Sequence, residues 1–585
     1  MYLERIATPQ DVRDLPQGAL APLCAEIRSA IVSSCARRGG HLGPNLAVVE
    51  LTVAIHRVFE SPRDRIVFDV SHQTYAHKML TGRAGAFLDP ARGGEVSGFS
   101  SPAESEHDLF ALGHTSTAAS RACGRARARA LTGEGGAVVA VIGDGSLSGG
   151  LAFEGLDNAA GLGGGVVLVV NDNEWSIAPD EGGVYATLAE LRRTRGQSPC
   201  NPFRALGLDY RYVEEGNDAV ALEAALREAR GLDHPVVVHV HTTKGAGYAP
   251  AEADPEGWHH VGPFDERTGE RAARPDAGYA SLTAELLLER MREDRGLVAV
   301  SAATPYVMGF SPARREEAGD QFVDVGIAEG HAVTFAAGLA RGGATPVLGV
   351  YATFLQRAYD QLWHDVCLNG LGVTVLVYGA SAAGNSDATH LGFFDVPMLG
   401  AMPGLTYLAP TCREEYAHML RWAVAEKHGP LAIRVPVMGP HGRADVALPE
   451  SWPAAPEVAR RGSEACVVAL GDAFDLGRRC ADELEGALGH PVTLVNPREA
   501  TNVDEGLLAE LSQGHRVLVT LEDGVLDGGF GQRVAATSAR LGGPRVLSYG
   551  LPRAFLDRFD AEGLLASCRM TPQAVREDVL GALGR

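Results

Sequence analysis

The sequence of 585 residues lacks the features that mark secreted and membrane-spanning proteins. Its nine cysteines form no CxxC pair, and in a chain of this length they indicate reduced, mostly buried thiols of a cytosolic protein. The first residues, MYLERIATPQDVRDLP, contain no apolar segment of a signal peptide, and no run approaches the roughly 18 apolar residues that a membrane span needs. We therefore expect a cytoplasmic protein with no membrane partner.

Positive charge is also scarce. Lysine and arginine total 52 against 73 aspartate and glutamate residues, so the net charge is −21, which argues against a nucleic-acid partner. The sequence contains no low-complexity tract and no short-period repeat, and its 45% apolar and 21% charged residues are typical of a globular protein. Because the chain is too long for one ordinary core, we expect several domains.

Short runs of valine, isoleucine and leucine alternate with helical patterns of about a dozen residues. Continuous apolar runs followed by helices predict parallel strands that are buried on both faces of a sheet. The clearest runs are GAVVAVIGD, GVVLVVNDN, HPVVVHVHT, ATPVLGVYA, GVTVLVYGA, EACVVALGD, HPVTLVNPR and HRVLVTLED. Seams near residues 265–280 and 448–464 separate three expected α/β domains, at 1–270, 271–450 and 451–585, each doubly wound around a mainly parallel sheet.

Two polar islands, GDG at 143–145 and NDN at 171–173, end two successive predicted strands. Because both strands belong to one βαβ unit, Asp144 and Asn173 are expected at the carboxyl edge of a parallel sheet, where open α/β sheets bind ligands. A carboxylate and an amide oxygen suit Mg²⁺, and glycines beside Asp144 let a diphosphate approach the backbone. The alternative is a plain strand–turn–helix in which Asp144 only caps the helix, and it stays open at this point.

GDG followed by NDN is similar to the metal–diphosphate motif of thiamine-diphosphate enzymes. Longer segments, in order from about residue 15 almost to the C-terminus, resemble 1-deoxy-D-xylulose-5-phosphate synthase. They include GGHLGPNLAVVELTVAIHRVFESPRDRIVFDVSHQTYAHKMLTGR, ALGHTSTAAS, HTTKGAGYAPAEADP, DVGIAEGHAVTFAAGLA and YATFLQRAYDQLWHDV. The resemblance implies a homodimer with a transketolase-like fold, in which the first domain binds the diphosphate, the second binds the aminopyrimidine and the third caps the sheet.

The resemblance also implies the cofactors, thiamine diphosphate and Mg²⁺, and the residues that bind them. Mg²⁺ would be bound by Asp144, Asn173 and the backbone carbonyl of Trp175. Histidine, lysine and hydroxyl groups of the matching thiamine-diphosphate shell can donate to phosphate oxygens. That shell consists of His72, Gly113, His114, Thr115, Gly145, Ser146, Asn173, Lys244, Ile327, Glu329 and Phe354.

Glu329, in IAEGHAV, matches the glutamate that in this family hydrogen-bonds N1′ of the aminopyrimidine and so promotes loss of the thiazolium C2 proton. The cofactor then serves as the electron sink for decarboxylation of a 2-oxo acid. Phe354 matches an aromatic side chain that packs on the pyrimidine. The matching catalytic residues around the reacting carbon, whose imidazoles suit proton transfer near neutral pH, are His41, His259, His390, Tyr351 and Arg357.

The sequence departs from the family pattern where the acceptor phosphate would bind. Family members carry a DRAGIVGADGQTH-type segment, but this chain reads YGASAAGNSDATH, with Tyr378 and Ser386 at the aspartate positions and Gly379 at the arginine position. A RYPRG-type strand end reads RVPVMG, which keeps Arg434 and puts Val437 at the second arginine. Two charge-assisted contacts of roughly 1.5–3 kcal/mol each are therefore missing, which lowers phosphate affinity by about two to four orders of magnitude.

The open alternative is that Arg357, Arg434 or a displaced arginine such as Arg92 replaces these contacts. Smaller departures are Ser71 and Asn217, where family members have glycine and histidine. The connection that follows Trp175 is also shorter than in the family, so gating of the active site is expected to differ.

These observations predict a carboligase that decarboxylates pyruvate, or a close 2-oxo acid, and transfers the acyl unit to an aldehyde-type acceptor other than glyceraldehyde 3-phosphate. Three alternatives stay open. They are an authentic 1-deoxy-D-xylulose-5-phosphate synthase with a rearranged phosphate site, a transketolase-like enzyme with a ketose donor, and a non-catalytic cofactor-binding relative. The third domain is expected to be structural or dimer-forming.

Overall fold

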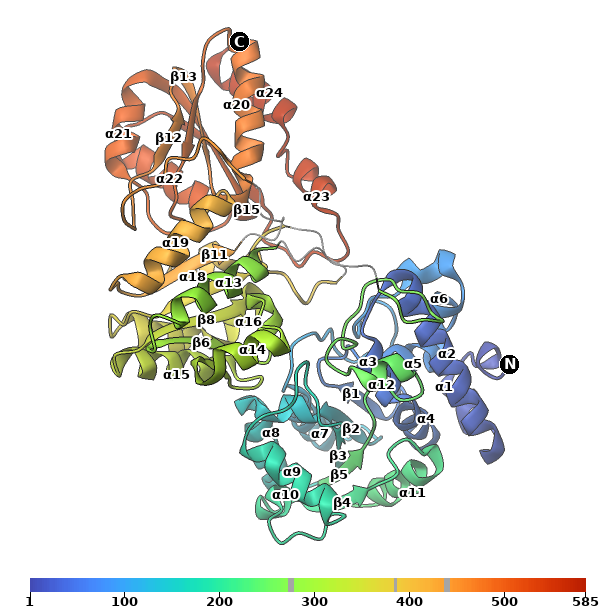
Figure 1. Cartoon of the computed structure of the whole chain (residues 1–585). Coiled ribbons are helices and arrows are strands. Elements are labelled where there is room, and N and C mark those ends of the chain that lie inside the picture. The colour runs from blue at the N-terminus through green and yellow to red at the C-terminus, as the bar shows by residue number, and fades with distance from the viewer. Residues whose placement is uncertain (272–277, 383–386, 436–441) are drawn as a thin grey trace. The chain divides into compact units, whose positions relative to one another are not determined.

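The computed structural model describes residues 1–585 except 272–277, 383–386 and 436–441. The chain divides into two compact units, each described by itself (Figure 1). Unit 1 comprises Met1–Arg274 with Gly326–Ala328, and unit 2 comprises Pro275–Val325 with Glu329–Arg585.

Unit 1 is built on a five-stranded sheet in the order β1-β2-β3-β5-β4, in which every neighbouring pair is parallel. The strands are β1 (Arg65–Phe68), β2 (Val138–Gly143), β3 (Val166–Asp172), β4 (Asp209–Val213) and β5 (Val236–His241). Alternate side chains of β2 and β3 enter two cores on opposite faces, one shared with α7 and α8 and the other with α4 and α11. The sheet is therefore doubly wound, and β2 and β3 end side by side at its carboxyl edge.

The helices of unit 1 connect these strands and wrap the sheet. They are α1 (Pro9–Arg13), α2 (Leu20–Arg38), α3 (Leu42–Ala47), α4 (Val49–Val58), α5 (Tyr75–Lys78), α6 (Gly85–Leu88), α7 (Ala118–Thr132), α8 (Gly150–Leu162), α9 (Gly183–Arg193), α10 (Pro202–Ala205), α11 (Ala219–Arg230) and α12 (Ala249–Ala253). By length and composition the segment Gln17–Arg38 could cross a membrane, but 56% of its apolar window is buried, as in the core helix of a globular protein.

Unit 2 contains two sheets. The first has the order β10-β11-β9-β8-β6-β7 and is entirely parallel, and the second has the order β12-β14-β13-β15-β16, in which only β12 runs antiparallel to its neighbour. The strands are β6 (Leu297–Ser301), β7 (Phe322–Asp324), β8 (Thr345–Tyr351), β9 (Thr374–Tyr378), β10 (Thr406–Leu408), β11 (Leu431–Val435), β12 (Glu457–Arg460), β13 (Glu464–Ala469), β14 (Thr493–Asn496), β15 (His515–Val525) and β16 (Arg545–Leu551).

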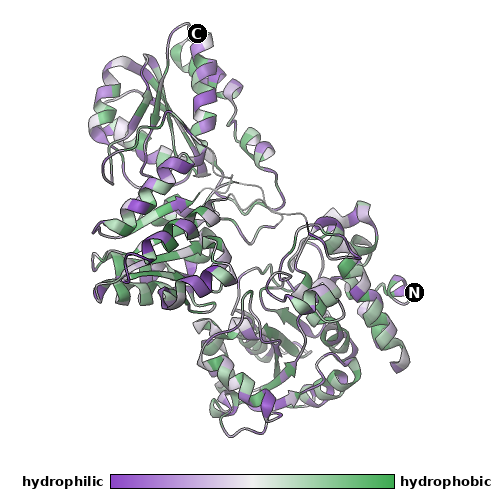
Figure 2. Cartoon of the chain, viewed as in Figure 1, coloured by the Kyte–Doolittle hydropathy of each residue, from purple (hydrophilic) through white to green (hydrophobic). Residues whose placement is uncertain are grey.

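The two sheets of unit 2 share one continuous core, which joins buried residues of β8 and β9 to residues of β13 and β15. The helices are α13 (Tyr279–Met291), α14 (Pro312–Ala318), α15 (Glu329–Arg341), α16 (Ala352–Leu355), α17 (Tyr359–Gln361), α18 (Asp395–Leu399), α19 (Arg413–Ala425), α20 (Phe474–Leu488), α21 (Glu505–Gly514), α22 (Phe530–Arg540), α23 (Ala561–Ser567) and α24 (Pro572–Leu583). In Figure 2 the strands are mostly apolar, whereas the covering helices carry both apolar and polar residues.

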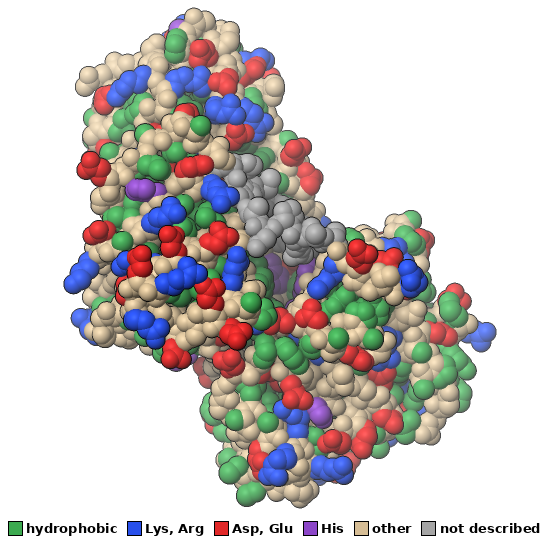
Figure 3. Space-filling model, viewed as in Figure 1, with side chains coloured by type: hydrophobic (Ala, Val, Ile, Leu, Met, Phe, Trp, Pro, Cys, Tyr) green, Lys and Arg blue, Asp and Glu red, His purple; other side chains and the backbone are tan. Residues whose placement is uncertain are grey.

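The predicted α/β class with mainly parallel sheets is confirmed, and all eight apolar runs form strands, namely β2, β3, β5, β8, β9, β13, β14 and β15. The strand before NDN is longer than expected, because β3 includes Asn171 and Asp172. On the face shown in Figure 3, acidic and basic side chains are interspersed in both units, with no large basic patch. The predicted domain limits remain a prediction.

Candidate active site

Asp144 lies at the carboxyl edge of the unit 1 sheet, directly after β2, and is 1% exposed. Its Oδ2 atom accepts the backbone N–H groups of Asn173 (2.8 Å) and Glu174 (2.6 Å), and its Oδ1 atom accepts the N–H of Gly145 (3.0 Å). The two polar islands are therefore joined directly. Asp144 begins a 3₁₀ turn, Asp144–Ser148, rather than capping α8, so the capping alternative does not describe its contacts.

A second carboxylate, that of Asp180, lies near Asp144 and was not identified from the sequence. Both of its carboxylate oxygens are buried and have no hydrogen-bond partner among the described residues, and Oδ1 lies 3.6 Å from where a Cβ of Gly145 would be. Burial, and repulsion by Asp180 and Asp172, raise the pKa of Asp144 well above its usual range. Burial and the charge of Asp172 likewise raise the pKa of Asp180 to about 7. Two buried carboxylates that repel each other favour a bound cation between them.

The donor set fits Mg²⁺ and a diphosphate. The Asn173 Oδ1 atom is buried without a partner among the described residues, so an amide oxygen is available beside two carboxylates. A Cβ on Gly145 would lie 2.7 Å from the Ser176 Cβ, so only glycine leaves this backbone accessible. In the part of the chain that the structure describes, no group of three or more His, Cys, Asp and Glu side chains is arranged to hold a metal ion. Amide and carbonyl oxygens, including the predicted one at Trp175, would therefore have to contribute.

Lys244 supplies the positive charge of this edge. Lys244 is 4% exposed, and its ammonium group donates to the Ser176 carbonyl at 2.6 Å and lies 5.7 Å from the centre of the Trp175 ring. Burial lowers the pKa of Lys244 to about 8, against the attraction of Asp144 and Asp180. A buried lysine beside acids is suited to neutralise an incoming phosphate oxygen.

The acid in the middle of NDN has a different role. Burial would raise the pKa of Asp172, but hydrogen bonds from His239 (2.8 Å) and Arg192 (2.6 Å) hold it at about 2. Arg192 belongs to α9, within the short connection that follows Trp175, and Tyr185 of the same helix donates to the Gly145 carbonyl at 3.1 Å. The shortened connection thus forms a helix that is bonded to both polar islands.

Four histidines gather in unit 1. The ring of His41 lies 5.0 Å from His72 and 4.7 Å from His260, and His72 stacks on His259 at 5.3 Å. Burial, followed by the charges of Lys244, His72 and His260, lowers the pKa of His259 well below its usual range, so this imidazole is neutral. Three of the four were predicted, and His260 was missed although it follows His259 directly in WHHVGPFD.

The predicted loop Gly113–Thr115 is held by an aspartate that the sequence analysis also missed. Asp69 follows β1, is fully buried, and accepts the N–H groups of Ser116 (2.7 Å), Thr117 (2.8 Å) and Ala118 (2.9 Å). The Ser116 hydroxyl in turn donates to the Ser146 carbonyl at 2.8 Å. This chain of bonds fixes the segment that contains His114 against the segment that contains Ser146.

Two further positions in unit 1 have a local explanation. Ser71 has a φ of +70°, a left-handed conformation that favours glycine, and its hydroxyl donates to Leu112 at 3.0 Å and accepts the N–H of Ser100 at 2.8 Å. Asn217 accepts the N–H of Thr243 at 2.9 Å.

Ile327, predicted to contact the cofactor, donates its N–H to the Ser148 hydroxyl at 2.9 Å, next to Ser146.

In unit 2, Glu329 is the first residue of α15 and is 7% exposed. Burial raises the pKa of its carboxyl group, although Arg357 lies 3.5 Å from Oε2 and opposes the shift. A carboxyl group that is kept protonated more readily than usual can share a proton with a ring nitrogen. The structure therefore brings together Glu329 and Arg357, two of the predicted catalytic residues.

The other predicted residues of unit 2 form an aromatic row. The Phe354 ring makes edge contacts with Tyr351 at 5.8 Å and with His390 at 5.6 Å. His390 Nδ1 lies 3.2 Å from the Asp387 carboxylate, and this contact orients the imidazole. Tyr351 ends β8, so this row also lies at the carboxyl edge of a parallel sheet.

Among the described residues, the positions where the family would bind the acceptor phosphate carry no arginine that could turn to a phosphate. Two of these positions, Ser386 and Val437, lie outside the described residues. Tyr378, at an aspartate position, is buried and donates its hydroxyl to Thr283 at 2.9 Å, so its side chain belongs to the core. Gly379, at the arginine position, has a φ of +67°, and a Cβ there would lie 3.0 Å from the Tyr351 ring.

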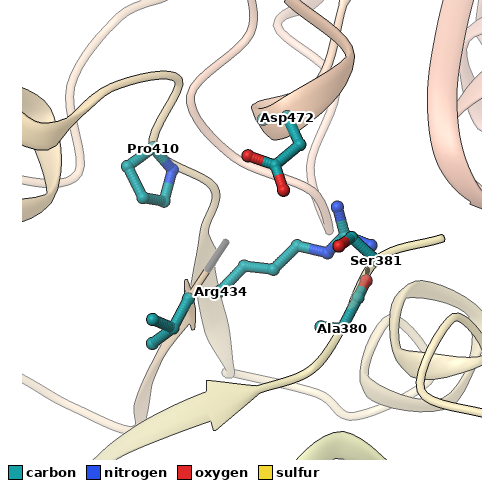
Figure 4. Close-up of a pocket in the computed structure, with 7 residues that line it drawn as sticks. Ala380, Ser381, Pro410, Arg434 and Asp472 are labelled. Carbon is teal, nitrogen blue, oxygen red and sulfur yellow. Dashed lines mark hydrogen bonds between the residues drawn. The ribbon is translucent and has the colours of Figure 1, made fainter. Parts of the chain in front are cut away.

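The retained Arg434 is already fully engaged. It is 3% exposed, its Nε donates to Asp395 at 2.8 Å, and its other nitrogens donate to Asp523 and to the Ala380 carbonyl. Figure 4 shows its side chain extended toward Ala380 and Ser381, with Asp472 above it, and these residues line a pocket too small to admit a water molecule. Arg357 is paired with Glu329, and the exposed Arg92 of unit 1 is paired with Glu95 at 2.8 Å. Each of the three arginines considered as replacements is therefore already paired with a carboxylate.

Four family models match the chain. They are 1-deoxy-D-xylulose-5-phosphate synthase at residues 3–201, the thiamine diphosphate binding domain of transketolase at 134–279, the transketolase pyrimidine binding domain at 277–438 and the transketolase C-terminal domain at 455–575.

Similar proteins extend over nearly the whole chain. 1-Deoxy-D-xylulose-5-phosphate synthase 1 of Geobacter sulfurreducens is 39% identical over 95% of this chain and 93% of its own. The 1-deoxy-D-xylulose-5-phosphate synthase of Mycobacterium ulcerans is 40% identical over 99% and 97%. Among solved structures, transketolase from Leishmania mexicana aligns over 96% of this chain and 97% of its own, with a TM-score of 0.44 and 16% identity.

Proposed function

Because the chain belongs to the 1-deoxy-D-xylulose-5-phosphate synthase family, we propose that it decarboxylates pyruvate, or a close 2-oxo acid, and transfers the acyl unit to an aldehyde that lacks a phosphate group. The protein is a thiamine-diphosphate-dependent transferase with a divalent metal ion as its second cofactor. The net reaction consumes one proton: pyruvate, the aldehyde and H⁺ give CO₂ and a hydroxyketone.

Bound thiamine diphosphate supplies the electron sink for loss of CO₂. Asp144, Asn173 and the Trp175 carbonyl would hold Mg²⁺, and Lys244 and the segments containing His114 and Ser146 would bind the diphosphate. Glu329 would hold a proton for the aminopyrimidine, which its raised pKa favours. His41, His259 and His390 would surround the reacting carbon, where His259, kept neutral by its lowered pKa, can accept a hydrogen bond from a substrate hydroxyl.

One observation supports the unphosphorylated acceptor most directly: Arg434 is buried between Asp395 and Asp523. Releasing its guanidinium toward a phosphate would leave two buried carboxylates without their cation, which costs several kcal/mol. Gly379 offers no side chain in its place.

The test is CO₂ release from pyruvate by the purified protein with thiamine diphosphate and Mg²⁺. It is run alone, with glyceraldehyde 3-phosphate and with unphosphorylated glyceraldehyde, and products are identified by mass. We expect stimulation by the unphosphorylated aldehyde. The double variant Gly379→Arg with Val437→Arg should gain activity toward glyceraldehyde 3-phosphate, and no gain would count against the missing-cation explanation.

The second candidate is an authentic 1-deoxy-D-xylulose-5-phosphate synthase with a rearranged phosphate site. It is favoured by the names of the relatives, which match at 38–40% identity over nearly the full chain. Strong stimulation by glyceraldehyde 3-phosphate with formation of 1-deoxy-D-xylulose 5-phosphate would establish this candidate and overturn the first.

The remaining alternatives separate in the same assay. A ketose donor used in place of pyruvate would indicate a transketolase-like enzyme. No CO₂ release from a 2-oxo acid, together with no product of acyl transfer from a ketose by mass, would indicate the non-catalytic alternative, which the retained Asp144, Asn173 and Glu329 disfavour. We further propose a cytoplasmic homodimer whose partners are these small molecules, and the mass in solution tests the dimer.

A further inference from the structure

An aromatic side chain that the sequence analysis did not consider extends the aromatic row of unit 2. The ring of Tyr306 lies 6.3 Å from that of Tyr351, which continues to Phe354 and His390. Tyr306 is 46% exposed, whereas Tyr351, Phe354 and His390 are half-buried. We call these four side chains the aromatic strip.

Tyr306 is held in place by its neighbours. It belongs to the 3₁₀ turn Pro305–Met308, in which Pro305, Val307 and Met308 are buried, so only the tyrosine faces outward. The Met308 side chain lies against Gly349 of β8, where a Cβ would approach it to 2.2 Å. The turn is therefore packed on the strand that ends at Tyr351, and the exposed ring is presented by a fixed backbone.

The strip lies at the carboxyl edge of the sheet, where open α/β sheets bind ligands. Tyr306 follows β6, Tyr351 ends β8 and Gly379 follows β9, and these are neighbouring strands in the order β9-β8-β6. Gly379 follows β9 directly, and a Cβ at this position would lie 3.0 Å from the Tyr351 ring, so glycine adds no side-chain contact to the ring here. Aromatic side chains gathered at such an edge, with one of them exposed, are typical of a binding site.

The charged groups beside the strip are paired with each other. Arg357 lies against Glu329, His390 against Asp387, and Arg434 between two aspartates. An anionic substrate group would have to compete with these carboxylates, whereas an uncharged ring would not. The strip therefore favours an apolar, flat substrate over a phosphorylated one.

We propose that the acceptor is an unphosphorylated aldehyde with an aromatic body, and that Tyr306 and Tyr351 determine this specificity by packing on its ring. The inference rests on the proposed carboligase function and names the substrate class of that site. The bond between the carboxylate and the carbonyl carbon of pyruvate breaks, and its electron pair forms the new bond to the aldehyde carbon. The aldehyde oxygen takes up one proton, so the products are CO₂ and an aryl hydroxyketone.

The experiment compares three acceptors with the full chain, thiamine diphosphate, Mg²⁺ and pyruvate: benzaldehyde, unphosphorylated glyceraldehyde and glyceraldehyde 3-phosphate. We expect kcat/KM to be highest for benzaldehyde. Tyr306→Ala should lower kcat/KM for benzaldehyde about three- to tenfold, the worth of one aromatic contact, and leave that for glyceraldehyde unchanged. Tyr306→Phe keeps the ring and should keep the preference. Phe555→Ala, which removes another exposed aromatic side chain of unit 2 (87% exposed), is the matched control.

The outcomes separate the inference from the proposed function. Preference for unphosphorylated glyceraldehyde, or a Tyr306→Ala variant that folds normally and loses activity equally toward both aldehydes, overturns the aromatic acceptor and leaves the carboligase function standing. Preference for glyceraldehyde 3-phosphate, or no CO₂ release with any acceptor, overturns both. Loss of benzaldehyde activity in Tyr306→Ala together with retention in Tyr306→Phe supports the inference.

Discussion

Asp180 illustrates how a single side chain can indicate a cation-binding site. Its two oxygens are buried without partners among the described residues and lie beside Asp144, whose own oxygens already accept three N–H groups. Like charges held together in a low dielectric are unfavourable until a cation arrives. The arrangement thus exchanges stability of the metal-free protein for metal affinity.

We predict that Asp180→Asn raises the stability of the metal-free protein and weakens Mg²⁺ binding by about tenfold or more, the usual effect of losing a supporting carboxylate. Thermal unfolding in a chelator measures the first effect, and Mg²⁺ titration followed by Trp175 fluorescence measures the second. The exposed Asp157 on α8 provides a control, Asp157→Asn, which should change neither quantity. Unchanged Mg²⁺ affinity in Asp180→Asn would show that this carboxylate does not face the metal.

At the scale of elements, the apolar strands were predictable because their runs are long and continuous, as in VVAVI of β2. Other strands are harder to predict because they are short or mixed: β7 and β10 have three residues each, and DYRYV of β4 alternates between polar and apolar residues. The contacts of Asp69 and Asp180 were not predictable, since their partners depend on how loops return to the sheet edge. The sequence pattern predicts strands and motif residues, whereas the pairing of Arg434 with Asp395 and Asp523 is seen only in the three-dimensional structure.

We predict that Arg434→Met destabilises unit 2 by about 3–5 kcal/mol, because Asp395 and Asp523 would remain buried without their cation. Chemical denaturation followed by circular dichroism measures the change. The control is Arg461→Met, which breaks an exposed ion pair with Glu510 and should cost at most about 1 kcal/mol. Equal effects of the two substitutions would mean that the Arg434 network contributes no more than a surface pair.

Glu522 gives β15 a pH-dependent stability. Burial raises its pKa to about 7, despite hydrogen bonds from the N–H groups of Phe530 and Gly531. Between about pH 4.5 and 7 the folded state binds the proton and the unfolded state does not, so the stabilising contribution is lost as pH rises through 7. The slope is at most about 1.4 kcal/mol per pH unit. Glu522→Gln should reduce the dependence of the unfolding free energy on pH over this range, as measured by chemical denaturation at several pH values. Glu505→Gln, at an exposed position, should leave this dependence unchanged.

At the scale of the whole molecule, the predicted site residues fall in both units: the metal and diphosphate residues in unit 1 and Glu329 with the aromatic strip in unit 2. We therefore expect that substitutions in unit 1 impair cofactor binding and that substitutions in unit 2 can impair catalysis without impairing cofactor binding. A ligand that binds only the folded state at 100 times its Kd adds about 2.7 kcal/mol of stability.

We predict that Asp144→Asn abolishes the rise in Tm that thiamine diphosphate and Mg²⁺ produce, because it removes a metal ligand. Glu329→Gln should keep most of this rise and lose CO₂ release, because it keeps the diphosphate residues and loses the carboxyl proton. Differential scanning fluorimetry with and without cofactors measures the rise in Tm of each variant, and the CO₂ assay measures its activity. A full thermal shift in Asp144→Asn would contradict the proposed metal site.

The left-handed backbone at Gly379 has a practical consequence for engineering this enzyme to use a phosphorylated acceptor. An arginine introduced there begins with an unfavourable φ and with its Cβ against the Tyr351 ring, so the first mutant along such a route is penalised before its charge can help. Selection by single substitutions would discard it. We therefore expect the double variant at positions 379 and 437 to gain only part of what two phosphate contacts are worth, and a variant whose loop after β9 is remodelled before the cation is introduced to gain more, so the order of changes affects how much activity is recovered.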